Sequence, residues 1–261
     1  MGLDHLSYSS ISTWLMCPRS WKLRYLEKIQ VPTAPALMFG SAFHNTIEEY
    51  LVRKHHVGAG DPQPLAELWS SLWQEQLAEN EGNVNWGKDT PESCFNDGLR
   101  MLQAKEVCDV VDDLTNNFGD DASQVERRVE LQVPDVPIPI IGYIDMIDKD
   151  GTPHDFKTSA RSWNGDKAQG EIQPLFYLAA LLQAGDVRHG FRFRHVVFVK
   201  TKTPQVQVIE SQHSIGAVFW LIGLIREVWR TIEAGHFPPN PTGWKCSLDY
   251  CEYWGMCRGK T

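Results

Sequence analysis

A short acidic hairpin constrains this chain more than any other feature of its sequence. Its parts are a strand, a turn and a returning strand, residues 142–148, 149–151 and 154–158. If the turn centres on Asp150, Asp145 and Asp155 lie opposite each other, about 5 Å apart. Lys157 follows two residues after Asp155 and therefore projects from the same face. Because two carboxylates and an ammonium group are costly to gather for stability alone, the pattern predicts a site for a divalent cation such as Mg²⁺.

The surrounding sequence favours this interpretation over a solvated surface hairpin with incidental charges. An Asp-x-Lys pair is common by itself, but here a Gly142-x-x-Asp145 segment precedes it on the partner strand. Ile140, Ile141 and Ile144 flank the segment and indicate that the first strand is central in a sheet.

Two further residue pairs are candidates for the same site. His44 lies in a helix predicted over residues 41–54, and Glu48, one turn later, could orient it, as carboxylates do for metal-bound histidines. A single histidine on a helix is more often structural, so both interpretations stay open. Gln173 and Tyr177 also lie one turn apart on a predicted helix, where the spacing alone is more typical of packing.

The six cysteines are unevenly distributed along the chain. Four of them suit a Zn²⁺ ion or an iron–sulfur cluster: Cys17, Cys246, Cys251 and Cys257. The C-terminal stretch is aromatic but has little secondary-structure signal, so a metal would explain how it is ordered. Four unrelated reduced thiols are the alternative. Cys94 and Cys108 lack partners at ligand spacing and are interpreted as small buried hydrophobic residues.

The order of the predicted elements is helices, strands, a helix, strands and a helix. This order indicates a mixed α/β domain around a central sheet. A linker at residues 58–64 and helical patterns over residues 65–118 indicate an insertion. We expect four parts: an N-terminal helical part (1–57), a helical insertion (58–121), a core (122–235) and a cysteine tail (236–261).

Charge and hydropathy narrow the classes of function. The net charge of −8 over 261 residues argues against a nucleic-acid coat across the whole surface, but it allows a local basic groove. No apolar run is long enough to cross a bilayer, and the N-terminus lacks a basic segment followed by an apolar stretch. We therefore expect a cytoplasmic protein that does not contact membranes.

Several of these residues form a series of spaced motifs. In chain order they are Gly40-x-x-x-His44, Gly142-x-x-Asp145, Asp155-x-Lys157 and Gln173-x-x-x-Tyr177, after a serine-rich opening that ends in Trp14-x-x-Cys17-Pro18. With this order the chain resembles the PD-(D/E)XK nucleases of the RecB-like exonuclease family. It is similar to the iron–sulfur branch, which includes AddB-type nuclease domains, CRISPR-adaptation exonucleases and phage relatives. The resemblance spans Ser9 to Cys257 apart from residues 58–118.

The resemblance implies a restriction-endonuclease-like fold, in which helices flank a mixed central sheet, with a helical insertion and a C-terminal cysteine staple. It assigns Mg²⁺ or Mn²⁺ to four ligands: His44, Asp145, Asp155 and the backbone carbonyl of Phe156. Lys157 would position the attacking water or the phosphate, and Gln173 and Tyr177 would orient the lysine or the DNA. Arg161 and Trp163 could pair with or stack on a single strand.

The resemblance also implies that the four cysteines of the two chain ends hold a [4Fe–4S] cluster, which packs the tail on the N-terminal region. The C-terminal cysteines of the family usually run C-x2-C-x5-C, whereas the first gap here is four residues, from Cys246 to Cys251. Zn²⁺ is therefore the rival occupant.

The function implied is that of a metal-dependent DNA exonuclease that prefers single strands or DNA ends. It would serve repair, recombination, CRISPR adaptation or a phage. No P-loop helicase motif is present, so any helicase, recombination or integration partner would be separate. A non-catalytic protein that binds DNA ends or assists assembly is the alternative, and the intact Asp145, Asp155 and Lys157 favour the enzyme.

Overall fold

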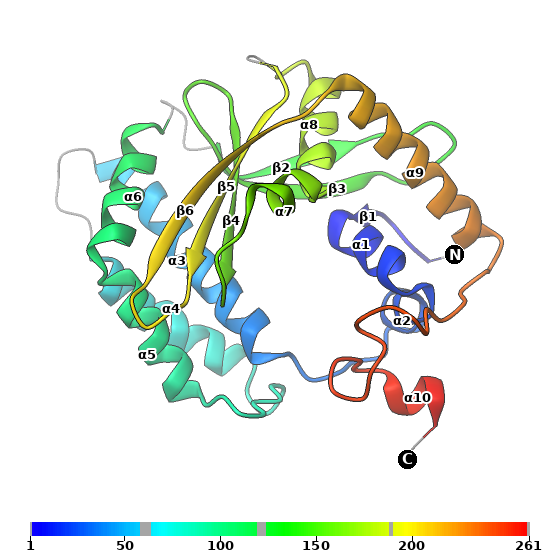
Figure 1. The fold of residues 1–261 in the computed structure, drawn as a ribbon, viewed down its shortest axis with the longest axis horizontal. Coiled ribbons are helices and arrows are strands. Elements are labelled where there is room, and N and C mark those ends of the chain that lie inside the picture. The colour runs from blue at the N-terminus through cyan, green and yellow to red at the C-terminus, as the bar shows by residue number, and fades with distance from the viewer. Residues whose placement is uncertain (1, 58–63, 119–123, 188–189, 260–261) are drawn as a thin grey trace.

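The computed structural model describes residues 2–57, 64–118, 124–187 and 190–259. A six-stranded mixed sheet organises these residues (Figure 1). The main strand order is β1-β3-β4-β5-β6, and β2 pairs with β3. The β1–β3 and β4–β5 pairs are parallel, and the other pairs are antiparallel. The strands are β1 (Leu6–Ser7), β2 (Val125–Leu131), β3 (Ile140–Ile147), β4 (Pro153–Ser159), β5 (Arg192–Val199) and β6 (Gln205–Gln212).

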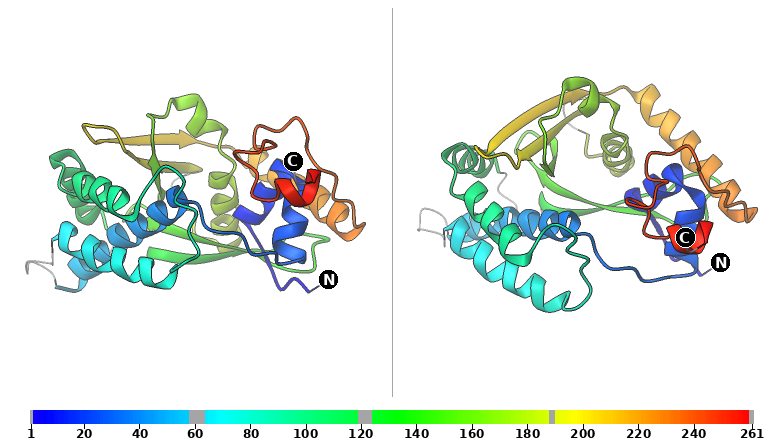
Figure 2. Two further views of the ribbon diagram at one scale, coloured as in Figure 1. Left: turned by 90° about the horizontal axis from the view of Figure 1, so that it is seen from below. Right: turned by 60° about the horizontal axis from the view of Figure 1, so that its bottom comes forward.

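Helices flank the sheet, so the mixed α/β fold predicted from the element order is confirmed (Figure 1). The helices are α1 (Tyr8–Met16), α2 (Pro18–Trp21), α3 (Pro35–Val57), α4 (Leu65–Glu79), α5 (Pro91–Leu102), α6 (Lys105–Asn116), α7 (Gly165–Gly170), α8 (Gln173–Ala184), α9 (Ile215–Glu233) and α10 (Trp254–Arg258). Figure 2 shows α1, α2 and the C-terminal tail side by side at one end of the molecule, with α4, α5 and α6 at the other.

Two hydrophobic clusters hold the sheet in place. One joins α1, α8 and α9 to β3 and includes Ile144 and Phe176. The other joins the four helices α3, α4, α5 and α6 to β4 and β5, and it includes Phe43 and Phe156. Because side chains alternate along a strand, the neighbours of Phe156 in β4 point away from the second cluster. The polar side chain of Asp155 is thereby directed towards α8, whose Gln173 contacts it.

The helix boundaries differ locally from the predictions. Helix α3 begins at Pro35, six residues before the predicted start. The predicted helix that carries Gln173 and Tyr177 is α8, and the short helix α7 before it is separate, because Glu171 is extended and Pro174 lies in the first turn of a new helix. In the predicted N-terminal helical part, α2 continues as a π-helical turn over Lys22–Leu26. The predicted linker at residues 58–64 lies outside the described residues except for Pro64.

Gly142 in β3 is a position where a side chain would collide with α8. A Cβ atom there would lie 2.5 Å from Phe176 Cε1 and 3.1 Å from Tyr177 Cε1. We expect Gly142→Ala to lower the free energy of unfolding by about 1–3 kcal/mol through overpacking, as measured by urea denaturation. Gly223→Ala is the matched control, because a Cβ there meets nothing within 4 Å. Equal stability of Gly142→Ala and the parent protein would contradict this account of the packing.

Candidate active site

Three side chains from two elements meet at one end of the acidic hairpin. They are His44 and Glu48 of α3 and Asp145 of β3, and one ligand atom of each lies within 4.8 Å of the other two. The i, i+4 spacing places His44 and Glu48 on one face of α3. The sequence predicted Glu48 only as a residue that orients His44, whereas its carboxylate lies in the group of ligand atoms.

The chemistry of His44 fits a metal ligand. Its Nε2 atom is buried and has no hydrogen-bond partner among the described residues. Burial, and then the charge of Lys157, lowers the pKa of His44 to about 4. The imidazole is therefore neutral near pH 7, which is the form that binds metal ions. An orphaned buried nitrogen beside two carboxylates is a donor set that suits a divalent cation.

The acidic groups of the site repel one another. Burial, followed by the charges of Asp145 and Glu126, raises the pKa of Glu48 to about 10. Burial and the charge of Asp155 raise the pKa of Asp145 well above its usual range. A bound divalent cation would offset this repulsion and reverse both shifts, because the ion would be the largest charge in the site.

The hairpin register brings the two aspartates level with each other, as predicted. Met146 pairs with His154, so Asp145 and Asp155 occupy the next positions along the two strands. The paired residues of β3 and β4 end at Met146 and His154, and Asp145 instead accepts a hydrogen bond from the backbone N–H of Phe156. The carbonyl of Phe156 as a metal ligand remains a prediction.

Asp155 is fixed by the other predicted residues and lies outside the group of three ligand atoms. Lys157 Nζ lies 2.5 Å from Asp155 Oδ2, and Gln173 Nε2 donates to Asp155 Oδ1 at 2.7 Å. The Tyr177 hydroxyl is 3.0 Å from the same Gln173 nitrogen and donates to the Tyr143 carbonyl. Gln173 therefore contacts Asp155, and Tyr177 contacts the β3 backbone, whereas the resemblance assigned both residues to orienting the lysine or the DNA.

Lys157 remains charged despite its surroundings. Burial alone would lower its pKa, but the charges of Asp155 and Asp145 outweigh burial, and the pKa lies above its usual value. The site thus combines an ammonium group with a cluster of carboxylates, which is the combination that the hairpin sequence predicted.

Sequence reasoning did not identify Glu126 or His195. Glu126 of β2 lies between the pairs Val125–Met146 and Arg127–Ile144, level with Asp145, and has a φ of 48°. Such a backbone angle is uncommon for a residue other than glycine. The hydrogen bond and charge of Glu126 raise the pKa of Glu48, so Glu126 belongs to the same cluster. An acidic residue in the strand before the Gly-x-x-Asp strand was the available signal.

His195 of β5 is fully buried beside Asp155, and neither ring nitrogen has a hydrogen-bond partner among the described residues. Its ring lies 5.3 Å from that of Trp163, and Lys167 Nζ lies 3.9 Å from the centre of the Trp163 ring. Trp163 is therefore half-buried against these two residues, and its stacking on a single strand remains a prediction.

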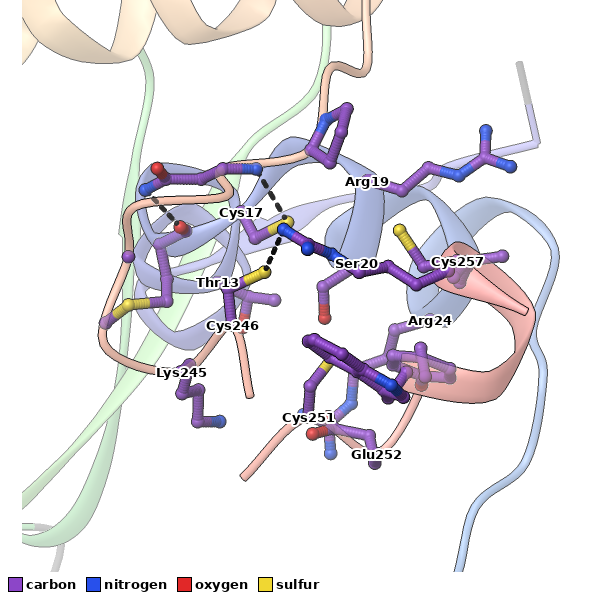
Figure 3. A pocket seen from close by; sticks show the side chains of 18 of the residues that line it. Thr13, Cys17, Arg19, Ser20, Arg24, Lys245, Cys246, Cys251, Glu252 and Cys257 are labelled. Carbon is purple, nitrogen blue, oxygen red and sulfur yellow. Dashed lines mark hydrogen bonds between the residues drawn. The ribbon is translucent and has the colours of Figure 1, made fainter. Parts of the chain in front are cut away.

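The four cysteines singled out by the sequence line one cavity of about 120 Å³ (Figure 3). Asn240 N–H donates to Cys17 Sγ at 3.5 Å, and Arg258 donates to Cys246 Sγ at 3.6 Å. All four are free thiols, and residues of α1 and α2 complete the cavity wall. The structure thus brings together Cys17 and three cysteines more than 220 residues later, while Cys94 packs in the cluster around α3.

No helix in the described ranges has the length and apolar character needed to span a membrane.

No curated protein matches the chain. A crystal structure of a "Putative exonuclease" from Eubacterium rectale superposes with a TM-score of 0.61 at 11% identity, covering 99% of this chain and 90% of that one. The structure of SSO0001 matches with a TM-score of 0.36 at 16% identity, covering 82% of this chain and 96% of that one, which is too distant to carry an argument.

The motifs, the fold and the site lead to one family. The family model of the PD-(D/E)XK nuclease superfamily matches residues 5–258, which is nearly the whole chain. The hairpin carboxylates, the lysine two residues after the second of them and the mixed sheet that supports them all lie within this match. The chain belongs to the PD-(D/E)XK nuclease superfamily.

Proposed function

We propose that this nuclease is a metal-dependent DNA exonuclease that acts on single strands or on DNA ends. The observation that carries the proposal is the convergence of His44, Glu48 and Asp145 next to the Asp155–Lys157 pair. Membership of the superfamily supports hydrolysis of DNA, and the Eubacterium rectale protein, described as an exonuclease, supports action at ends.

The residues of the site would divide the chemistry among them. When bound, Mg²⁺ or Mn²⁺ lowers the pKa of a coordinated water and stabilises negative charge on the scissile phosphate. His44, Glu48 and Asp145 would hold the ion, together with Asp155 and the Phe156 carbonyl if they move closer to it. Lys157 would orient the water or a phosphate oxygen with its N–H groups.

The supporting residues would keep this arrangement rigid. Gln173 donates to one oxygen of Asp155, which leaves the other oxygen facing Lys157. The Tyr177 hydroxyl accepts from Gln173 and donates to the Tyr143 carbonyl, so it attaches Gln173 to the β3 backbone. A catalytic constellation gains most of its effect from such fixed positions, because ordering the groups costs nothing at the moment of reaction.

We also propose that Cys17, Cys246, Cys251 and Cys257 hold a [4Fe–4S] cluster, with Zn²⁺ as the alternative. Their convergence on one cavity supports a metal centre, and the N–H donors at Cys17 and Cys246 are partners that ligating sulfurs commonly have. The protein would work in the cytoplasm in repair, recombination, CRISPR adaptation or phage replication, with a separate helicase, recombination or integration partner. The helical insertion (58–121) and the cysteine tail (236–261) are proposed as parts added to the nuclease core.

The first test of the proposed function is Asp155→Asn, which keeps the size of the side chain but removes the charge that attracts Lys157. We expect cleavage of end-labelled single- and double-stranded DNA with Mg²⁺ or Mn²⁺ to fall at least about 100-fold. Asp150→Asn in the exposed turn is the control and should cleave normally. Full activity of Asp155→Asn would refute the mechanism, and binding of DNA ends without cleavage by the parent protein would favour the non-catalytic alternative.

The second test concerns His44 and Glu126, and its readout is metal affinity. His44→Ala should weaken Mn²⁺ binding by at least tenfold in calorimetry, and Glu126→Gln should weaken it less, because Glu126 reaches the cluster through Glu48. His56→Ala, an exposed histidine of the same helix, should leave affinity unchanged. Unchanged metal affinity together with a large loss of thermal stability in His44→Ala would establish His44 as a structural histidine.

The third test distinguishes the occupants of the cysteine cavity. Protein purified without air should be brown and contain about four iron atoms per chain, as a [4Fe–4S] cluster requires. Cys17→Ser should lose the colour and lower stability, since metal binding couples to folding. Cys94→Ser and Cys108→Ser should keep the colour. A metal content of about one zinc and no iron per chain would contradict the cluster and indicate a structural zinc site.

A further inference from the structure

We propose that Trp244, Lys245 and Tyr250 of the C-terminal tail form a binding surface for single-stranded DNA, separate from the hydrolytic site. The inference rests on the proposed function for its substrate, but the surface is defined by residues that the nuclease motifs do not include.

Two aromatic rings of the tail are exposed to solvent, whereas most large apolar side chains of the protein are buried. Trp244 is 65% exposed and Tyr250 is 62% exposed. Their ring centres lie 5.8 Å apart at an interplanar angle of 68°, so the two rings support each other and leave faces open to solvent. Every nucleobase has a flat π-face, and exposed aromatic rings are the usual platforms on which single strands stack. Trp163, in contrast, is half-buried and contacts Lys167 and His195.

The charge around these rings is opposite to that of the chain as a whole. Residues 17–28 and 236–261 together carry seven lysines and arginines against three acidic residues, whereas the whole chain carries 25 against 33. Four of the cations line the cysteine cavity: Arg19, Arg24, Lys245 and Arg258. Figure 3 shows Arg19 and Arg24 on α2 and its continuation, and Lys245 on the tail. A basic patch on an acidic protein is complementary to a phosphate backbone.

Helix α1 links this patch to the hydrolytic site. Ser7, directly before α1, pairs with Ile141 of β3, the strand that carries Asp145. Ser12, Thr13 and Met16, further along α1, line the cysteine cavity. The nine residues of α1 span about 13 Å, so one short helix separates the cavity from that strand.

The tail also contacts the chain just before the metal-binding helix. The Tyr253 hydroxyl donates to the Ile29 carbonyl, and the segment that follows leads into α3, which carries His44. Figure 2 shows the tail next to this segment.

The chemistry favours a nucleic acid over a docked protein. The centre of a protein–protein interface is depleted of charged residues. Here Lys245 directly follows Trp244, and Arg258 lies 4.9 Å from the centre of the Trp254 ring. Cations interleaved with aromatic rings are typical of surfaces that hold the backbone and bases of a single strand together.

The experiment measures binding of a 20-nucleotide fluorescein-labelled oligothymidine by anisotropy, without divalent cations so that nothing is cleaved. Trp244→Ala and Tyr250→Ala should each bind about tenfold more weakly. Trp220→Ala is the matched control, because Trp220 is 56% exposed on α9. Lys245→Gln should reduce the slope of log affinity against log salt by about 0.7. Thermal unfolding of every variant verifies that the fold is retained.

An abasic oligonucleotide separates stacking from other effects. Removing the bases should weaken binding to the parent protein about tenfold but should add little loss in Trp244→Ala, because the stacking partner is then already absent. Equal binding of the oligothymidine by Trp244→Ala, Tyr250→Ala and the parent protein would overturn the inference and leave the patch as a docking site for a protein. Stacking signatures in a protein that cleaves no DNA would refute the proposed function and keep the inference.

Discussion

The hydrogen bond from the Phe156 backbone to the Asp145 carboxylate is the contact on which the site depends. It lies just beyond the last paired residues of the β3–β4 hairpin, where the two strands separate. Beyond this point β3 pairs with β1 and β2, and β4 pairs with β5. His44 and Glu48 of α3 gather around Asp145 here, and Gln173 of α8 contacts Asp155.

The protein holds these groups together against their own repulsion. Several carboxylates are buried near one another, and only Lys157 supplies a nearby positive charge to this group, to judge from the described residues. Burying unpaired charges is unfavourable by several kcal/mol in general. The two hydrophobic clusters on either side of the sheet make this arrangement stable, because they fix α3 and α8 without help from the site itself. A cation bound to the cluster, as proposed above, would offset this cost.

The sequence was sufficient for features that depend on spacing along the chain. The register of Asp145 and Asp155 follows from a turn centred on Asp150, and the lysine follows from alternation along a strand. Contacts between distant segments could not be predicted in this way. Glu48 and His44 share a face by helical period, but their approach to Asp145 depends on how α3 crosses the sheet. Glu126 reaches the cluster through an unusual backbone angle, and His195 through the parallel pairing of β4 with β5. His195 has no local signal, and the signal for Glu126 is only an acidic residue in the strand before the Gly-x-x-Asp strand.

Helix α1 connects the candidate active site to the cysteine cavity. It directly follows β1, which pairs with the strand that carries Asp145, and its last turn forms part of the cysteine cavity, so the two sites are attached to one short rigid element. Binding of a metal by Cys17 and the C-terminal cysteines would close almost the whole chain into a loop, which restrains the unfolded state. It would also fix the end of α1 and the tail together. A metal centre there would then matter to the proposed activity, because it would hold the proposed strand-binding surface in a fixed position relative to the candidate active site.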